Sequence, residues 1–349
     1  MNRILETCDA KYILLSRIGH GGTSQVYKGY SINDKDTPHK LYAIKIFKQR
    51  QKKCFEKETS INNILPPKNK QNSFLTLFAY GIGYMYKEPK TQNHNNQPTE
   101  ICPNIKKTKI FYKIEELCEN GELFDYIYKL KQGFTEEISA KIFAKILHAV
   151  KILHEKNIVH CDIKPENILL GNDFEPKLID FGYSKYINKE NNNNNNTNNT
   201  INNIVYGNEG SESYSSPEIR RNFMSGYDGV KSDIFSLGVL LFVITVGRFP
   251  FISCEYSDEK YGLIMDKKYE EYWANYNKYN LTKEFKDLIN HLICYEPKDR
   301  LSIDEIFNHS WITMHVNKSE NKDNNCCADD ENVLNELKKR RDYILKKSN

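Results

Sequence analysis

Hydrophobic positions in the first third of the chain alternate with polar ones or form short runs rich in β-branched residues. Both patterns are typical of β-strands. They predict strands at residues 12–15, 25–29, 41–47, 75–78 and 110–114, and one helix near residues 54–65. We therefore expect a small antiparallel sheet that carries one main helix.

After residue 117 the spacing of hydrophobic positions lengthens toward the 3.6-residue period of an α-helix. The pattern predicts helices at residues 123–130, 136–156, 232–246, 283–294 and 303–309. A last helix, basic and amphipathic, is predicted at residues 332–347, beyond a polar linker at 317–330. The fold class is therefore expected to be α+β, with a small sheet lobe followed by a larger, mainly helical lobe.

Two asparagine-rich stretches interrupt these patterns, at residues 92–97 and at about 188–203. Polar side chains of this kind bury too little apolar surface to offset the entropy lost on ordering the chain. Both stretches are predicted to be insertions in surface loops.

Composition adds bounds to this picture. The chain has 349 residues, of which 39% are hydrophobic and 28% charged, so it can form one large two-lobed unit or two domains. Its longest near-continuous apolar run, residues 238–247, falls short of the roughly 20 residues that cross a bilayer. We expect a buried core helix there, no membrane association, and a cytoplasmic or nuclear location.

The nine scattered cysteines and the net charge of +4 exclude two further classes. An odd number of cysteines without ligand spacing favours free thiols over a disulfide framework or a zinc site. A small, evenly spread positive charge does not indicate nucleic-acid binding, which normally requires a concentrated basic face. Function must therefore be inferred from a local site.

The first candidate site lies in the predicted sheet. Glycines in the segment 18–26 fall between two strands, where backbone amides could approach phosphate oxygens. Ala43 and Lys45 share one face of the next strand, and a lysine there needs an anion. Glu58 lies on the apolar face of the following helix and is the expected partner of Lys45, with Glu56 as the fallback.

The strongest candidate site lies in the segment His160-Cys161-Asp162-Ile163-Lys164-Pro165-Glu166-Asn167, which is followed by Asp180-Phe181-Gly182. Residues 168–170 and 177–179 read as a hairpin, which would bring Asn167 and Asp180 together. An amide oxygen and a carboxylate suit Mg²⁺. Asp162 could then accept a proton from a hydroxyl group, and Lys164 could neutralise charge on a transferring group.

Taken together, these motifs resemble those of eukaryotic Ser/Thr protein kinases, from Gly19 to Arg300 and Trp311. The resemblance is greatest to the calcium/calmodulin-dependent group, although the chain has no calcium-loop pattern. It implies a bilobal fold with an N-terminal extension at residues 1–11, a small lobe at 12–116, a large lobe at 117–313, and a linker with a basic helix at 314–349.

The resemblance also implies an ATP- and Mg²⁺-dependent transfer of the γ-phosphoryl group to Ser or Thr of protein substrates. It assigns Asp162 as the base, Lys164 as the γ-phosphate contact, Lys45 with Glu58 as the phosphate-anchoring pair, and Asn167 with Asp180 as metal ligands. The implied nucleotide-binding residues are Ile18, Gly19, Gly21, Val26, Ala43, Lys45, Glu116, Leu117, Glu122 and Leu169. Glu218 is expected to pair with Arg300, and Asp233 to tie a core helix to the catalytic loop.

Two positions depart from the family pattern. Cys161 replaces an arginine that would clamp an activation-loop phosphate, so we expect activity without obligatory phosphorylation of that loop. A gapless count puts Glu115 at the back wall of the nucleotide pocket, where the family has an apolar or Thr side chain. Either Ile114 fills that wall through an irregularity in the strand, which we favour, or the pocket is unusually acidic.

Partners and alternatives follow from the same residues. Glu122 and Glu166 could receive one basic residue upstream of the target hydroxyl. The C-terminal helix could bind calmodulin or make an autoinhibitory contact, against the simpler interpretation of a solvated helix. The main alternative function is a pseudokinase scaffold that acts through protein interaction, and a small-molecule phosphotransferase is a weaker one.

Overall fold

The computed structural model describes residues 3–33, 40–66, 73–87, 105–187, 203–222, 224–316 and 331–348. It divides into two compact units, Met1–Lys68 with Leu75–Cys118 and Asn69–Phe74 with Glu119–Asn349. The asparagine-rich stretch at 92–97, and that at 188–203 up to its last residue, lie outside the described residues. Each unit is described by itself below.

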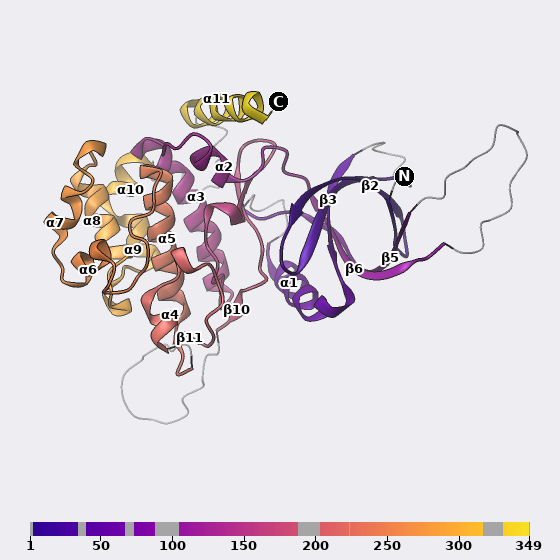
Figure 1. Ribbon diagram of the computed structural model, residues 1–349, viewed down its shortest axis with the longest axis horizontal. Coiled ribbons are helices and arrows are strands. Elements are labelled where there is room, and N and C mark those ends of the chain that lie inside the picture. The colour runs from indigo at the N-terminus through magenta and orange to yellow at the C-terminus, as the bar shows by residue number, and fades with distance from the viewer. Residues whose placement is uncertain are drawn as a thin grey trace, which may run out of the picture. The chain divides into compact units, whose positions relative to one another are not determined.

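The first unit is a closed antiparallel barrel (Figure 1). Its strands follow one another around the barrel in the order β1-β2-β3-β4-β6-β5. Their bounds are β1 Arg3–Glu6, β2 Lys11–His20, β3 Ser24–Ser31, β4 Leu41–Phe47, β5 Leu77–Lys87 and β6 Thr108–Glu116. The predicted helix is α1, Lys52–Ile64, preceded by the short η1, Gln49–Gln51.

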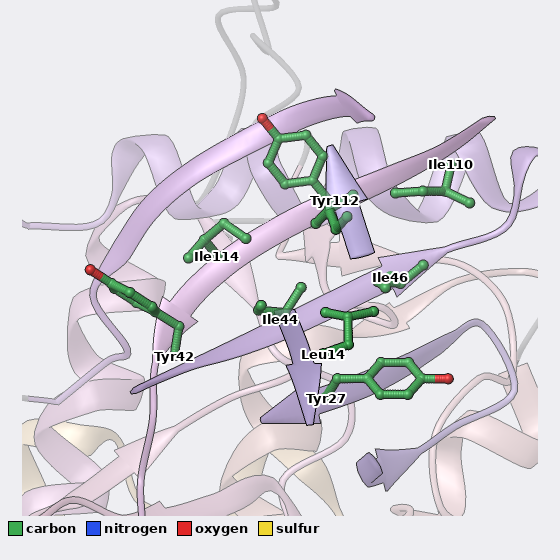
Figure 2. Packing of buried hydrophobic residues seen from close by; sticks show 9 residues of the cluster. Leu14, Tyr27, Tyr42, Ile44, Ile46, Ile110, Tyr112 and Ile114 are labelled. Carbon is green, nitrogen blue, oxygen red and sulfur yellow. The ribbon is translucent and has the colours of Figure 1, made fainter. Parts of the chain in front are cut away.

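Alternation along the strands separates two environments. One face of β4 and β6 points into the barrel, where Ile44 and Ile114 are fully buried among the side chains drawn in Figure 2. On the other face, Phe47 and Phe111 pack against Phe55 of α1. The outer face of these two strands is therefore the one that meets the helix.

Strand β1 is an element that the hydrophobic pattern did not indicate. It pairs with β2 on one side and with β5 on the other, which closes the barrel. Only Ile4 and Leu5 are apolar in this segment, too few to show a period, yet Leu5 is completely buried. Closure removes the exposed sheet edges that β2 and β5 would otherwise present.

The second unit is mainly helical, as predicted. The helices that the pattern indicated are α2 Leu123–Tyr128, α3 Glu136–Glu155, α5 Gly229–Val246, α8 Lys283–Leu292, α9 Ile303–Asn308 and α11 Glu331–Ser348. Four shorter helices were not predicted: α4 Pro217–Asn222, α6 Glu259–Met265, α7 Tyr269–Ala274 and α10 Ser310–His315.

Three small two-stranded sheets accompany these helices. They pair β7 Ile158–Val159 with β10 Lys185–Tyr186, β8 Ile168–Leu170 with β9 Pro176–Leu178, and β11 Ile204–Val205 with β12 Tyr227–Asp228. The β8–β9 pair is the hairpin that the sequence predicts, shifted by one residue in its second strand.

Helix α5 forms the centre of this unit. The Asp228 side chain caps its first turn by accepting from the Lys231 amide, and Gly247 ends it in the left-handed region that glycine favours. At Gly238 an added Cβ would lie 2.6 Å from Leu292 of α8, so only glycine allows this approach. Among the described helices, α5 alone has the length and apolarity of a membrane span, and 89% of it is buried inside the protein, as a core helix is.

Candidate active site

The glycine-rich turn joins β2 to β3. The Gly21 amide donates to the Ser24 carbonyl at 3.0 Å, which tightens the turn. No heavy atom lies within 4 Å of the position that a Cβ would take at Gly21 or Gly22. The backbone is therefore open on that side, as an approach to phosphate oxygens requires.

Lys45 and Glu58 make the contact that the sequence predicts. The Lys45 ammonium donates to both carboxylate oxygens of Glu58, at 2.9 and 2.8 Å, and Glu58 is 1% exposed. The fallback partner Glu56 is exposed and pairs with Lys52 instead. A buried carboxylate needs such a cation, since unpaired burial of its charge is costly.

The other small-unit residues assigned to nucleotide binding lie on β2, β3, β4, β6 and the segment after β6. Ala43 and Leu117 are buried, and Ile18 is 49% exposed. Val26 stands opposite Lys45 across the β3–β4 pair, and Gly19 opposite Val26 across β2–β3. The Glu116 carboxylate accepts from the hydroxyl and the amide of Thr76, which fixes the end of β6.

The interpretation favoured from the sequence is an irregular strand in which Ile114, and not Glu115, fills the back wall of the nucleotide pocket. This interpretation is wrong. The β4–β6 register runs without a shift and sets Ala43 opposite Glu115. Ile114 points into the barrel core, whereas Glu115 lies on the outer face and pairs with Lys113 at 2.6 Å. Glu115 therefore lies on the same face as Ala43 with its charge paired, and the other alternative, an unusually acidic nucleotide pocket, stays a prediction.

In the second unit, the β8–β9 hairpin brings the two predicted metal ligands to one place. Ile168 pairs with Leu178, and the Ile179 amide donates to the Asn167 carbonyl at 3.0 Å. Asp180 follows immediately, with a backbone φ of 65°. This left-handed conformation is costly for a non-glycine residue and is typical of functional positions.

The Asp162 carboxylate is held from three directions. Its Oδ2 accepts from the Asn167 amide at 2.8 Å and lies 2.8 Å from the Lys164 ammonium. Its Oδ1 accepts from the Ser211 backbone amide at 2.9 Å. Three charged or amide donors on one carboxylate fix its orientation.

Asn167 and Asp180 fit a hard divalent cation. The Asn167 amide nitrogen donates to the backbone and side-chain oxygens of Asp162, which turns the amide oxygen to the opposite side. Asp180 is exposed to solvent. An amide oxygen and an accessible carboxylate are ligands that Mg²⁺ accepts while it keeps several waters.

The backbone around Asp162 is fixed from the core of the second unit. The Asp233 carboxylate of α5 accepts from the amides of His160 and Cys161, at 2.8 and 2.9 Å, and lies 2.8 Å from His154 Nε2. Cys161, at φ 63°, is thereby held in a strained conformation. This confirms the predicted tie between a core helix and the catalytic loop.

Ser211 is a site residue that the sequence reasoning did not assign. Besides the amide contact to Asp162, its hydroxyl accepts from the Lys164 ammonium at 2.6 Å. No short-range pattern points to it, because Ser211 lies 49 residues after Asp162 in the chain. A Cβ added at Gly210 would lie 2.4 Å from the Cys161 carbonyl oxygen, so only glycine lets the backbone approach Cys161 this closely.

Glu122, Glu166 and Leu169 complete the second-unit residues. Glu122 forms an isolated bridge with Leu169 just before α2. Although Glu122 reaches solvent, burial by neighbouring protein raises the pKa of its carboxyl, and the charges of Asp125 and Glu166 raise it further. Among the described residues, no hydrogen-bond donor reaches the buried Oε2 of Glu166. The charges of Lys129 and Lys164 lower the pKa of Glu122, but the net shift is upward.

The predicted pair of Glu218 and Arg300 is present. The guanidinium of Arg300 donates to both carboxylate oxygens of Glu218, at 2.6 and 2.8 Å, and both residues are buried. Arg300 also donates to the Cys294 and Lys231 carbonyls. The pair anchors the start of α4 to the segment after α8.

Comparison with known proteins agrees with this geometry. The family model described as "Protein kinase domain" matches residues 12–312. Similar curated proteins include the human SNF-related serine/threonine-protein kinase, 39% identical over 58% of this chain and 24% of its own length. They also include serine/threonine-protein kinase kin-29 of Caenorhabditis briggsae, at 34% identity over 59% of this chain and 22% of its own.

A testis-specific serine/threonine-protein kinase 2 from mouse is 34% identical over 58% of this chain and 52% of its own length. The matched region spans about a quarter of the length of the first two relatives. The family model, however, covers most of this chain, including both units. The chain belongs to the protein kinase family.

Proposed function

We propose that the protein is a serine/threonine kinase that transfers the γ-phosphoryl group of MgATP to protein substrates. The observation that carries the proposal is the fixed Asp162 carboxylate, which has the Lys164 ammonium 2.8 Å away and the Asn167 amide behind it. A base beside a cation is the arrangement that phosphoryl transfer to a hydroxyl requires.

Each group has one part in this mechanism. Asp162 orients the substrate hydroxyl and takes its proton, while Lys164 balances charge on the transferring group. Lys45, held by Glu58, contacts the phosphates of the nucleotide, and the glycine turn offers its open backbone to them. Asn167 and Asp180 would hold Mg²⁺, which supplies charge neutralisation at the phosphates when bound. Catalysis thus comes from positioning and electrostatics, with no covalent intermediate.

The test is Mg²⁺-dependent incorporation of phosphate into a generic basic protein. We expect incorporation by the wild type and its loss in Lys45→Met and Asp180→Ala. Asp304→Asn, which changes a carboxylate that is 75% exposed on α9, serves as the matched control and should retain activity. A folded wild type that transfers no phosphate would leave the pseudokinase scaffold as the function.

For the substrate, we propose a preference for one basic residue upstream of the target hydroxyl. The support is the Glu122 and Glu166 pair, with its unpartnered carboxylate oxygen and raised pKa. An incoming arginine would supply the missing donors. A positional peptide library should show enrichment of Arg or Lys at one upstream position, and a flat profile would remove the preference.

For the C-terminal helix, the contacts favour an intramolecular role over capture by calmodulin. Val333 and Leu337 of α11 are 1% exposed, so the apolar side of its first half is already covered, while Leu345 is 52% exposed. The Arg340 guanidinium donates to the carbonyls of Tyr126, Gln132 and Gly133 at 2.7 to 2.9 Å. A calmodulin-like partner would have to undock the helix first. We therefore propose that α11 supports α2, against which it packs (Figure 1).

A further inference from the structure

Two charged residues of β6 are buried without a part in the mechanism above. Lys113 is 2% exposed and Glu115 is 7% exposed. Lysine and glutamate are rarely buried to this extent unless they are paired. Their position on the barrel explains why Lys113 and Glu115 pair with each other, and it links this pair to Lys45.

Both side chains lie on the face of the sheet that carries Lys45. The antiparallel register sets Lys113 directly opposite Lys45 and Glu115 opposite Ala43. Residues that face each other across two strands share one side of the sheet. Two lysines are therefore neighbours here, and like charges in this relation repel unless anions separate them.

Two carboxylates balance the two lysines. Lys113 Nζ lies 2.6 Å from Glu115 Oε1 and 3.3 Å from Glu58 Oε2. Lys45 Nζ lies at 2.9 and 2.8 Å from the two oxygens of Glu58. The four groups form one buried chain, Lys45–Glu58–Lys113–Glu115, whose formal charges sum to zero. Glu58 thus has two cationic neighbours, and the distances favour Lys45.

We propose that Glu115 is a positioning residue that keeps Glu58 committed to Lys45 by holding the ammonium of Lys113. Lys113 is within reach of a Glu58 oxygen that Lys45 also uses. If the Glu115 charge is removed, Glu58 is the remaining carboxylate of the network for Lys113. The ammonium then moves toward Glu58 and loosens its two bonds to Lys45. Because removal of one partner leaves a buried charge uncompensated, the rearrangement is strongly driven.

The consequence for ATP rests on the proposed function, in which Lys45 contacts the phosphates. A loosened Lys45 weakens nucleotide binding without touching the peptide-binding residues of the second unit. Removal of both charges takes away Lys113, which competes with Lys45 for Glu58, together with Glu115, which holds Lys113. The double substitution therefore leaves the pair of Lys45 and Glu58 intact, and its effect is smaller than that of the Glu115 change alone.

The experiment compares Glu115→Gln, Lys113→Met and the double variant Lys113→Met/Glu115→Leu by steady-state kinetics. Glu115→Gln is expected to raise the KM for ATP about tenfold, with the double variant within about threefold of wild type, because residues in one network couple. The KM for the peptide should stay unchanged. Glu6→Gln, which removes an exposed pair with Lys107 in the same barrel, is the matched control and should leave both KM values unchanged.

Two results would overturn the proposal: a wild-type ATP KM in folded Glu115→Gln, or a double variant as impaired as Glu115→Gln. Lowered thermal stability with an unchanged ATP KM would assign the pair a purely structural role and would also contradict it. If the wild type transfers no phosphate, the proposed function fails, and crystal structures then test the network alone. In Glu115→Gln, Lys113 Nζ should lie within about 3 Å of Glu58, and an unmoved Lys113 refutes the proposal.

Discussion

Three donors hold the Asp162 carboxylate, two from its own loop and one from a distant segment. Asn167 follows it in the same loop, Lys164 lies between them, and Ser211 arrives from the segment before α4. A carboxylate held this way needs no reorganisation when a hydroxyl arrives. Its ability to accept a proton is therefore the property to change by mutation.

Asp162→Asn should reduce phosphate transfer by about 100- to 10,000-fold, the range that general-base catalysis contributes. The amide keeps the shape of the side chain but cannot take the proton. The kcat should fall while the KM for ATP changes little, in single-turnover and steady-state assays. An Asp162→Asn protein with near wild-type kcat would exclude Asp162 as the base.

Glu122 gives a prediction for the dependence on pH. Its folded pKa is raised, so the carboxyl takes up a proton at a higher pH than an ordinary glutamate. Attraction for a basic substrate residue is then lost as the pH falls through that raised pKa. The KM ratio of a norleucine peptide to an arginine peptide should shrink over this window, and Glu122→Gln should flatten it.

The raised pKa of Glu122 also determines how the free energy of unfolding changes with pH. The folded state favours the protonated form, so this stabilisation is full below the ordinary glutamate pKa and is lost as the pH rises through the folded pKa. Glu122→Gln should accordingly raise the melting temperature at neutral pH and change it little at acidic pH. Melting temperatures are measured by calorimetry across the pH range. A larger increase at acidic pH than at neutral pH would contradict a raised pKa of Glu122.

At the scale of elements, α11 is tied to the segment between α2 and α3 by one buried side chain. Arg340 donates to one carbonyl of α2 and to two in that segment, lies 3.8 Å from the centroid of the Phe134 ring and pairs with Glu336. The sequence predicted the helix from its period. It did not predict that Arg340 is buried against α2 and the segment after it. The carbonyl partners lie more than 200 residues earlier in the chain, and an arginine in a basic stretch is normally expected to be solvated.

Arg340→Ala should destabilise the fold by about 2 kcal/mol, since it leaves buried carbonyl groups without donors. Lys339→Ala, whose side chain is 83% exposed, is the matched control and should be neutral. Deletion of residues 317–349 should lower both the melting temperature and the activity. A rise in activity after deletion would indicate autoinhibition instead and would contradict support by α11.

Apolar contacts surround the side chain of Cys161. This residue packs in a cluster with Ile187, Val205, Ile219 and Tyr227, which joins β7, β10, β11, α4 and β12. Nearby, the Lys185 ammonium donates to the Glu209 carboxylate at 2.6 Å. Cys161 thus lies among apolar side chains, and the nearby acid Glu209, 47% exposed, is paired with Lys185.

We therefore expect the protein to stay active after complete dephosphorylation. The measurement is phosphate transfer before and after phosphatase treatment, with the modified sites mapped by mass spectrometry. Glu209→Gln should lower activity in both states, because it removes the charge that Lys185 binds. Loss of turnover on dephosphorylation alone would show that a loop phosphate is required.

At the scale of the whole molecule, the hydrophobic pattern predicted the long helices, whether they bury one face, as α3 does, or nearly all of their residues, as α5 does. Strand β4 was predicted at its observed bounds, and α3 and α5 within a few residues. Elements that rely on distant partners were missed. Strand β1 depends on pairing with β5, more than 70 residues away, and α6 and α7 are too short to show a period.

The candidate site divides in the same way. Asp162, Lys164 and Asn167 are close in the chain, so their meeting could be predicted from one loop and one hairpin. The network of Glu58, Lys113 and Glu115 could not, since it depends on strand register and on which face each side chain takes. A single-residue slip would have placed Ile114 on that face instead.

Under the proposed function, this fold delivers a phosphoryl group to a hydroxyl oxygen of a protein. The most direct measurement is mass-spectrometric detection of phosphate on three peptides that differ only in a Ser, Tyr or Ala acceptor, after incubation with the purified protein and MgATP. We expect phosphate on the Ser peptide, little on the Tyr peptide, and none after Mg²⁺ is chelated. No phosphate on the Ser peptide from a folded protein that binds MgATP would contradict it.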